Sequence, residues 1–249
     1  MVTPHAVRDV LDGVCAGVLT GGSMETPIIN TMEIHEHPVA RRRLGRHVVL
    51  DPRSWSYPAP MAAAIVSVRH KRLVPIFDQG ELGSCTGNAA VGCISTRPFT
   101  HRGTEKEAVE TYAAATHLDR IKGIYPPDDT GSSGLAVMKA LRKKGLITAY
   151  THAFSVDHAL RALVLRPGIT GMAWREACDE PNSRGIVRYA GGIRGGHEVE
   201  LVGIDVDQKL VWFANSWDTS WGLDGYFAMH FDDYGKALAD HGDATFPNA

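Results

Sequence analysis

The sequence predicts an α+β fold in which a helical lobe and an antiparallel β lobe face each other across a cleft. Helical patterns fill the first half of the chain, and from Gly168 onward the pattern changes to strand-like runs joined by turns. A helical half followed by an antiparallel half buries its apolar faces as two packed layers. The chain of 249 residues, 44% of them hydrophobic, is also long enough to bury a sizeable core.

Composition excludes several classes of protein. The net charge of −2 gives no reason to expect a nucleic acid or an acidic membrane as a partner. No apolar run is long enough to span a bilayer, and the first residues do not form a signal peptide, so we expect a cytoplasmic protein. His35 and His37 have no further ligands nearby, so we expect no metal, and no motif indicates a cofactor.

The N-terminal region differs from the rest of the chain. Apolar residues recur at helical spacing between Val7 and Val18, which predicts a short amphipathic helix. Periodicity is then lost, and an Arg-rich stretch follows at 41–46. The simplest interpretation of that stretch is a solvated loop, and the alternatives are a processing site and an anion-binding patch.

The stretch from Val74 to Ala90 joins a loop to a helix. Its first half is rich in glycine and other loop formers, and its second half is small and apolar. Cys85 lies at the junction, in the first turn of the predicted helix. Free backbone N–H groups and the helix dipole favour a thiolate there, which makes Cys85 a candidate nucleophile with a lowered pKa.

Further elements follow in order. Predicted helices cover Glu105–Arg120, Gly134–Lys144 and Val156–Leu165, the second capped by Ser132 and Ser133 and closed by Gly145. Predicted strands cover Ile169–Trp174, Glu198–Val206, Lys209–Asn215 and Gly225–Phe231. His197 precedes one of these strands and Asn215 ends another, so a base and an orienting amide would come from the β lobe.

Three motifs resemble those of the papain-like cysteine peptidases. Asp78–Cys85 matches Asp-Gln-Gly-x-x-Gly-Ser-Cys, Gly196 and His197 match the family's Gly-His, and Asn215–Phe227 matches its Asn-Ser-Trp motif with Asp218 in place of a glycine. The resemblance covers roughly Val49 to Tyr234. Leu82 stands where secreted members have a second cysteine, which favours a bacterial or phage-like branch lacking the framework disulfide.

The resemblance implies a papain-like two-lobe fold with the active site in the cleft. It assigns Cys85 as nucleophile, His197 as its proton-transfer partner and Asn215 as the residue that orients the imidazole. It also implies that the side chain of Gln79 helps to form the oxyanion hole. Trp217 and Trp221 match the indoles that shield the His–Asn hydrogen bond from water.

Glu198 and Glu200 depart from the family pattern, which has an apolar strand at this point. By alternation both carboxylates lie on the face opposite His197. We expect that face to be exposed to solvent or covered by a basic partner such as Arg188 or Arg194.

We therefore expect a cysteine-type endopeptidase acting on peptide or protein. The alternatives are a cell-wall peptide hydrolase with the same mechanism and a non-catalytic binding or structural protein with the same fold. We expect residues 1–47 to form an N-terminal extension and residues 48–249 the catalytic domain. The extension could be an inhibitory prosegment or a docking segment, and the scarcity of inhibitory segments among bacterial-type relatives favours docking.

Overall fold

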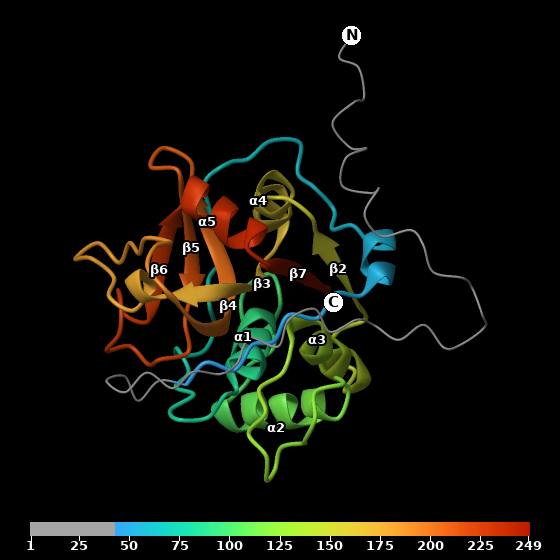
Figure 1. The fold of residues 1–249 in the computed structure, drawn as a ribbon. Helices are drawn as coiled ribbons and strands as arrows, with labels where there is room; N and C mark the ends of the chain where they lie inside the picture. The colour runs from blue at the N-terminus through green and yellow to red at the C-terminus, as the bar shows by residue number, and fades with distance from the viewer. Residues whose placement is uncertain (1–42) are drawn as a thin grey trace, which may run out of the picture.

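Helix α1, Cys85–Ile94, lies between the two lobes of the molecule (Figure 1). The computed structural model describes residues 43–249, so the predicted helix at Val7–Val18, the His35 and His37 pair and Cys15 lie outside the described residues. All the residues of α1 are buried, because it packs against helices on one side and against the sheet on the other. Its small, apolar sequence suits this position. The helix begins at Cys85, as the sequence predicts.

The helical lobe is completed by α2, Glu105–Thr116, and α3, Gly134–Lys143. Both start where the sequence predicts, because the hydroxyl of Thr104 caps α2 and that of Ser133 caps α3 through backbone N–H groups of the first turn. Helix α2 ends before the predicted Arg120. None of the helices within residues 43–249 is long and apolar enough to cross a membrane.

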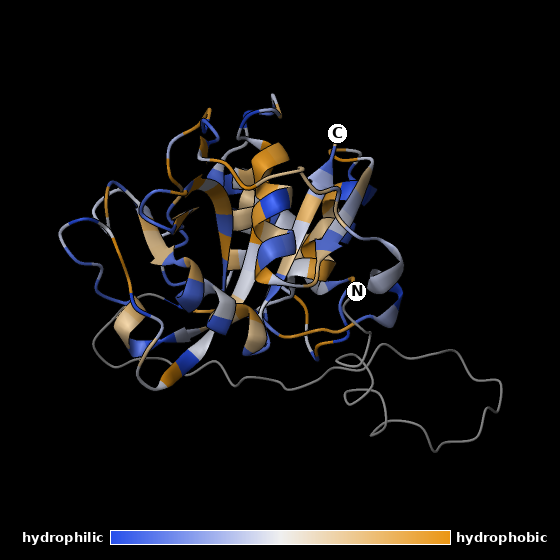
Figure 2. Ribbon diagram, turned by 90° about the horizontal axis from the view of Figure 1, so that it is seen from above, coloured by the Kyte–Doolittle hydropathy of each residue, from blue (hydrophilic) through white to orange (hydrophobic). Residues whose placement is uncertain are grey.

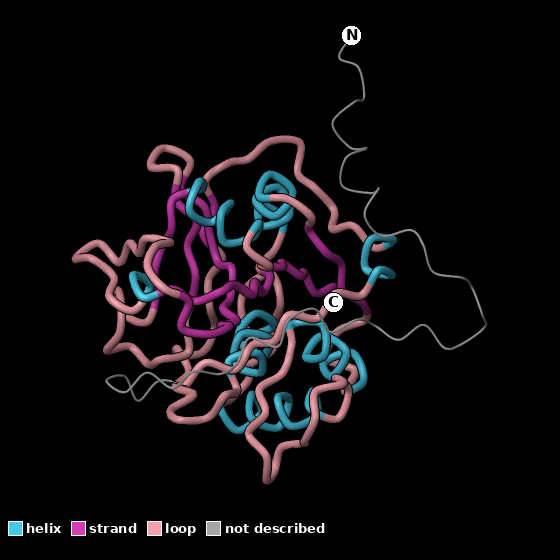
Figure 3. The backbone as a smooth tube through the Cα atoms, in the orientation of Figure 1, coloured by secondary structure: helices cyan, strands magenta, loops and turns pink. Residues whose placement is uncertain are grey.

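The β lobe contains an antiparallel sheet with strand order β2-β7-β3-β4-β5-β6, and β1 pairs with β4 outside that order. The strand bounds are β1 Val68–Arg69, β2 Ala149–Ala153, β3 Gly168–Arg175, β4 Ile193–Asp205, β5 Leu210–Ala214, β6 Tyr226–His230 and β7 Asp243–Asn248. Helices α4, Val156–Leu165, and α5, Phe231–Ala239, pack on this sheet, and η1, Pro52–Ser56, is a short 3-10 helix. Figure 3 shows the helices and strands separated in this way.

The predicted strands are present, and the helix at Val156–Leu165 has the predicted bounds. The sequence pattern did not indicate β1, β2, α5 or β7. Strand β7 contains both Asp243 and Pro247 and pairs with strands that are distant in sequence, so its local pattern is weak.

The two largest apolar clusters of residues 43–249 form most of the core. One lies among α1, α2 and α3, and the other lies between the sheet and helices α4 and α5. In Figure 2 the hydrophobic residues concentrate along the central strands and helices. The two-lobe α+β prediction is therefore confirmed, with α1 and β4 forming the boundary between the lobes.

The face of β4 that carries Glu198 and Glu200 is buried, because α1 packs against it. Glu200 forms a salt bridge with Arg72, and Glu198 lies 3.8 Å from Nε of Arg46. A basic partner does cover this face, but the predicted partners were wrong. One of them, Arg194, pairs with Asp179 instead.

We predict that Arg72→Ala destabilises the protein by about 3–5 kcal/mol, because it leaves the buried carboxylate of Glu200 without its cation. Urea unfolding followed by circular dichroism measures this loss. The matched control is Lys106→Ala, which removes an exposed pair with Glu110 one helical turn away and should cost only about 0.3–0.5 kcal/mol. Equal losses in the two variants would contradict the assignment of Glu200 as a buried, paired charge.

Candidate active site

Cys85 lies where the two lobes meet. Its thiol is completely buried at the start of α1. Burial raises the pKa of this thiol, and the nearby backbone N–H groups of Glu198, Gly45 and Thr86 oppose that shift. The nucleophile predicted from the helical lobe therefore lies beside β4, the strand that carries His197.

His197 and Asn215 are brought together by the pairing of β4 with β5. Nε2 of His197 lies 2.8 Å from Oδ1 of Asn215, which also accepts a hydrogen bond from the backbone N–H of Ser216. Within residues 43–249, Nδ1 of His197 forms no hydrogen bond, so no bond joins it to Cys85. If the proton is on Nε2, Nδ1 is left as the imidazole's acceptor.

Aromatic rings enclose the imidazole. The ring of Trp217 stacks on His197 with centroids 4.9 Å apart, and Trp174 meets it edge-on at 4.8 Å. Trp221 contacts Trp217 rather than the imidazole. Sequence reasoning missed Trp174, although alternation along β3 from Met172, which pairs with His197, would have placed it on the same face.

Gln79 is positioned by the loop that leads into α1. Its Nε2 donates to the carbonyl oxygen of Arg43 at 2.9 Å and to that of Leu82 at 2.8 Å. Its Oε1 accepts a hydrogen bond from the hydroxyl of Ser216 at 2.6 Å. The predicted oxyanion donor therefore already contacts a peptide carbonyl of the chain itself.

Residues Arg43–His47, which we call the cleft segment, run between the two lobes and across the N-terminus of α1 (Figure 1). On the β side, the N–H of Arg46 donates to the carbonyl of Gly196 at 2.9 Å. On the helical side, Ser132 donates to the carbonyl of Gly45 at 2.8 Å and accepts from His47 at 2.7 Å. The cleft segment is thus an extended chain held by backbone hydrogen bonds to both walls.

Glycines allow this close approach. A Cβ atom at Gly45 would lie 2.0 Å from the carbonyl oxygen of Gly83, and one at Gly196 would lie 2.1 Å from that of Arg46. These distances are far below van der Waals contact, so the cleft accepts the segment only because both positions lack side chains. The side chain of Arg43 adds a 2.8 Å ion pair with Asp129 at one end.

Burial under the cleft segment determines the charge state of the site. It raises the pKa of Cys85 to about 12 and lowers the pKa of His197 to about 4. Desolvation penalises both charged forms, so the thiol and the imidazole are both neutral. The sequence predicts a lowered pKa for Cys85, and the structure differs because desolvation outweighs the backbone hydrogen bonds to the sulfur.

Two other predicted features can be placed. Asp218 has φ of 54°, the left-handed backbone expected where the family has a glycine. The three cysteines within the described residues, Cys85, Cys93 and Cys178, are free thiols. Residues 43–249 contain no group of three or more His, Cys, Asp or Glu side chains that could hold a metal ion.

Comparison with known proteins gives one family. A model of the papain family cysteine proteases matches residues 139–241, a range that includes His197 and Asn215 but begins after Cys85. A viral cathepsin of Adoxophyes honmai nucleopolyhedrovirus is 24% identical over 183 residues, which make up 64% of this chain and 54% of the viral protein. A cathepsin B-like cysteine proteinase of Caenorhabditis elegans is 44% identical over 48 residues, or 18% of this chain and 13% of that protein. The chain therefore spans about half the length of the first relative and much less of the second.

Solved structures of this family share the fold. Xylellain, a cysteine protease from Xylella fastidiosa, superimposes with a TM-score of 0.70 at 20% identity, covering 90% of this chain and 99% of xylellain. Procathepsin B S9 from Trypanosoma congolense gives 0.58 at 14% identity, covering 83% of this chain and 87% of that one. The family match and the sequence relatives show that this chain is similar to the papain-like cysteine peptidases, and the solved structures show that it shares their two-lobe fold.

Proposed function

We propose that the chain hydrolyses peptide bonds with Cys85 as nucleophile, and that the structure represents a self-covered form of the enzyme. The observation that carries the proposal is the cleft segment. An extended peptide already lies over the sulfur of Cys85, and one of its carbonyl oxygens accepts a hydrogen bond from Gln79. A substrate chain in this cleft would find the same groups.

The chemistry needs one proton transfer before attack and one after it. Nδ1 of His197 takes the proton of the Cys85 thiol, and the thiolate then attacks the substrate carbonyl carbon. Nε2 of Gln79 and the backbone N–H of Cys85 stabilise the resulting oxyanion. The imidazolium returns its proton to the leaving amine, and water hydrolyses the thioester to free the acid and the thiol. Asn215 holds the imidazole in the required tautomer throughout.

The covered state supports a blocking role for the N-terminal extension rather than the docking role that the sequence favours. The cleft segment uses the donor of Gln79, buries Cys85 and keeps the Cys–His pair neutral. We infer that residues 1–47 act as an inhibitory prosegment and that substrate is admitted only when the cleft segment leaves. Leu44 is also buried in the core of the β lobe, so the extension and the domain share contacts across the predicted boundary at Val48.

In the full chain carrying Gly45→Ala, which dislodges the cleft segment, we predict that Cys85→Ala and His197→Ala each abolish cleavage of a denatured-casein substrate, and that combining the two changes costs little more, because the two residues act as one unit. Gln79→Ala should lower kcat by about 10²–10³, since its bond strengthens in the transition state. Chromatography with mass spectrometry of the released peptides measures turnover.

The matched control is Cys93→Ala, which removes a second buried thiol from the same helix and should keep wild-type turnover. Purified bacterial peptidoglycan tests the cell-wall alternative in parallel. Casein cleavage that survives in Cys85→Ala would refute the nucleophile. A chain that stays inactive on both substrates even when Gly45→Ala dislodges its cleft segment would favour the non-catalytic alternative.

The buried imidazole predicts a pH dependence of stability. His197 has a pKa of about 4 in the folded protein and about 6.5 in the unfolded chain, so the unfolded chain binds a proton at a higher pH. The neutral imidazole therefore stabilises the fold above pH 6.5, and this contribution is lost as the pH falls from about 6.5 to about 4. The expected loss is about 3 kcal/mol. Urea unfolding of the wild type and of His197→Gln at a series of pH values measures it, and parallel pH curves for the two proteins would contradict the covered, neutral state.

A further inference from the structure

The side chain of Arg46 occupies a buried pocket beside the reaction centre. Its guanidinium is fully buried and lies between two acids from different strands. Nη2 contacts Oδ2 of Asp243 at 2.5 Å and the carbonyl of His241 at 2.9 Å, and Nε lies 3.8 Å from Oε2 of Glu198. The pocket therefore holds a cation with acids from β4 and β7.

Two glycine residues leave space for this guanidinium. A Cβ atom at Gly171 of β3 would lie 2.1 Å from Nε of Arg46, so any other residue there would displace the guanidinium. A Cβ atom at Gly134, the first residue of α3, would lie 2.9 Å from Oε1 of Glu198. Both lobes thus leave room for a planar cation to approach Glu198.

The pocket contains more acceptor capacity than Arg46 uses. Within the described residues, neither carboxylate oxygen of Glu198 has a hydrogen-bond donor, and Oδ1 of Asp243 also has none. Burial and the nearby charge of Asp243 raise the pKa of Glu198, while Arg46 opposes this shift. Two acids in such a site are costly without a cation, so the pocket favours a positively charged occupant at all times.

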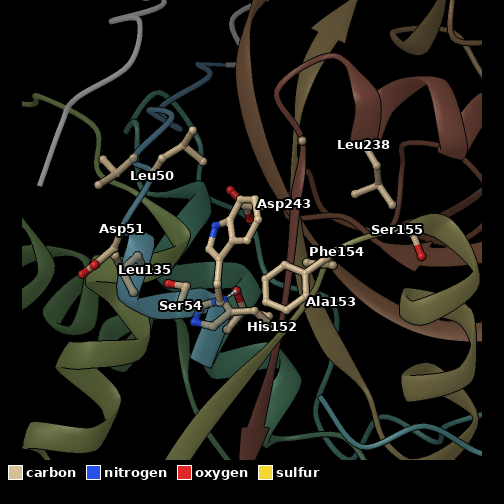
Figure 4. A pocket seen from close by; sticks show the side chains of 15 residues that line it. Leu50, Asp51, Ser54, Leu135, His152, Ala153, Phe154, Ser155, Leu238 and Asp243 are labelled. Carbon is tan, nitrogen blue, oxygen red and sulfur yellow. Dashed lines mark hydrogen bonds between the residues drawn. The ribbon is translucent and has the colours of Figure 1, made fainter. Parts of the chain in front are cut away.

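The opening of the pocket lies at Asp243. The side chain of this residue is 32% exposed, and it also lines a cavity of about 270 Å³ shared by both lobes. Figure 4 shows Asp243 and His152 in this cavity, with Leu135 on one side and Phe154 on the other. A side chain that enters the cleft therefore has an acidic floor and a partly apolar outer wall.

We propose that Glu198 and Asp243 form a recognition pocket for a basic side chain of the substrate, with arginine as the favoured residue. The inference rests on the proposed function, because a substrate must replace the cleft segment to reach Cys85. The N–H of Gly45 touches the sulfur, and the next residue, Arg46, fills the pocket. A peptide in the same cleft brings a side chain near its reacting carbonyl to the same acids.

Arginine suits the pocket better than lysine. A guanidinium presents five donors in a plane, and that of Arg46 donates to Asp243 and to the carbonyl of His241 while its Nε lies 3.8 Å from Glu198. A lysine ammonium is a compact, strongly hydrated charge that loses more on dehydration. The enzyme should rank substrates with arginine first, lysine second and the uncharged arginine isostere citrulline last.

The kinetic test uses the full chain carrying Gly45→Ala, which dislodges the cleft segment and Arg46 with it, and fluorogenic peptides that carry arginine, lysine or citrulline at each of the three positions before the scissile bond. At one position, kcat/KM for arginine should exceed that for citrulline at least tenfold. Glu198→Gln and Asp243→Asn should each reduce this preference to a few-fold. Asp157→Asn, which changes an exposed acid of α4, is the control and should keep it. Cleavage of the arginine and citrulline peptides at equal rates would overturn the proposal.

A binding test separates the pocket from catalysis. Arg46→Ala in the full chain empties the pocket, and 10 mM methylguanidinium should then raise the thermal midpoint by about 2–4 °C, whereas the uncharged isostere methylurea should not. Arg43→Ala loosens the same segment but leaves Arg46 in place, so methylguanidinium should not stabilise it. If Arg46→Ala does not fold alone, methylguanidinium should restore folding.

The kinetic test and the binding test can fail independently, so failure of the peptidase function is distinguishable from failure of the cation pocket. An enzyme that cleaves no peptide, combined with stabilisation of Arg46→Ala by methylguanidinium, would reject the proposed peptidase function and keep the cation pocket. No difference between methylguanidinium and methylurea, or equal stabilisation of Arg43→Ala, would reject the pocket even in an active enzyme.

Discussion

The contact between the backbone of the cleft segment and both walls of the cleft governs the rest of the structure. Gly45 lies against Gly83 on the helical side, and Arg46 lies against Gly196 on the β side. This contact excludes water from Cys85 and His197, and dehydration keeps both residues neutral. Cys85 and His197, which the proposed mechanism needs as an ion pair in an open cleft, are therefore neutral in the covered one.

The two buried carboxylates on β4 differ in how their charges are compensated. Glu200 is paired with Arg72, which belongs to the domain itself, so its charge is compensated whether or not the cleft is open. Glu198 is paired with Arg46, which belongs to the cleft segment, so its compensation leaves with that segment. The pair of Glu200 with Arg72 thus stabilises the interface between the lobes. The pair of Glu198 with Arg46 links the cleft segment to the proposed recognition of a substrate cation that would replace it.

The sequence was sufficient for those parts of the site that depend on local signals. Hydroxyl caps set the starts of α2 and α3, the change from loop formers to small apolar residues set the start of α1, and strand patterns placed His197 near Asn215. These signals act over a few residues, and they survive in the folded protein because tertiary packing agrees with them.

Long-range pairings could not be predicted in the same way. The ion pair between Arg46 and Asp243 joins residues 197 positions apart, and an Arg-rich stretch has the composition of a solvated loop whatever it later contacts. Alternation correctly placed Glu198 and Glu200 on one face of a strand, but only the packing of α1 shows that this face is buried. The prediction of a lowered pKa for Cys85 was wrong for the same reason, because the desolvation of the thiol depends on which residues cover it.

The rate of Cys85 alkylation tests the central claim most directly. Iodoacetamide at pH 8, followed by mass spectrometry of each cysteine peptide, compares the wild-type chain with Gly45→Ala, whose added Cβ would collide with the carbonyl of Gly83. Gly235→Ala adds a methyl group with ordinary contacts in α5 and serves as the control. The account predicts that Cys85 reacts slowly in the wild type and at least tenfold faster in Gly45→Ala alone. Rapid alkylation of Cys85 in the wild type, unchanged in Gly45→Ala, would contradict it.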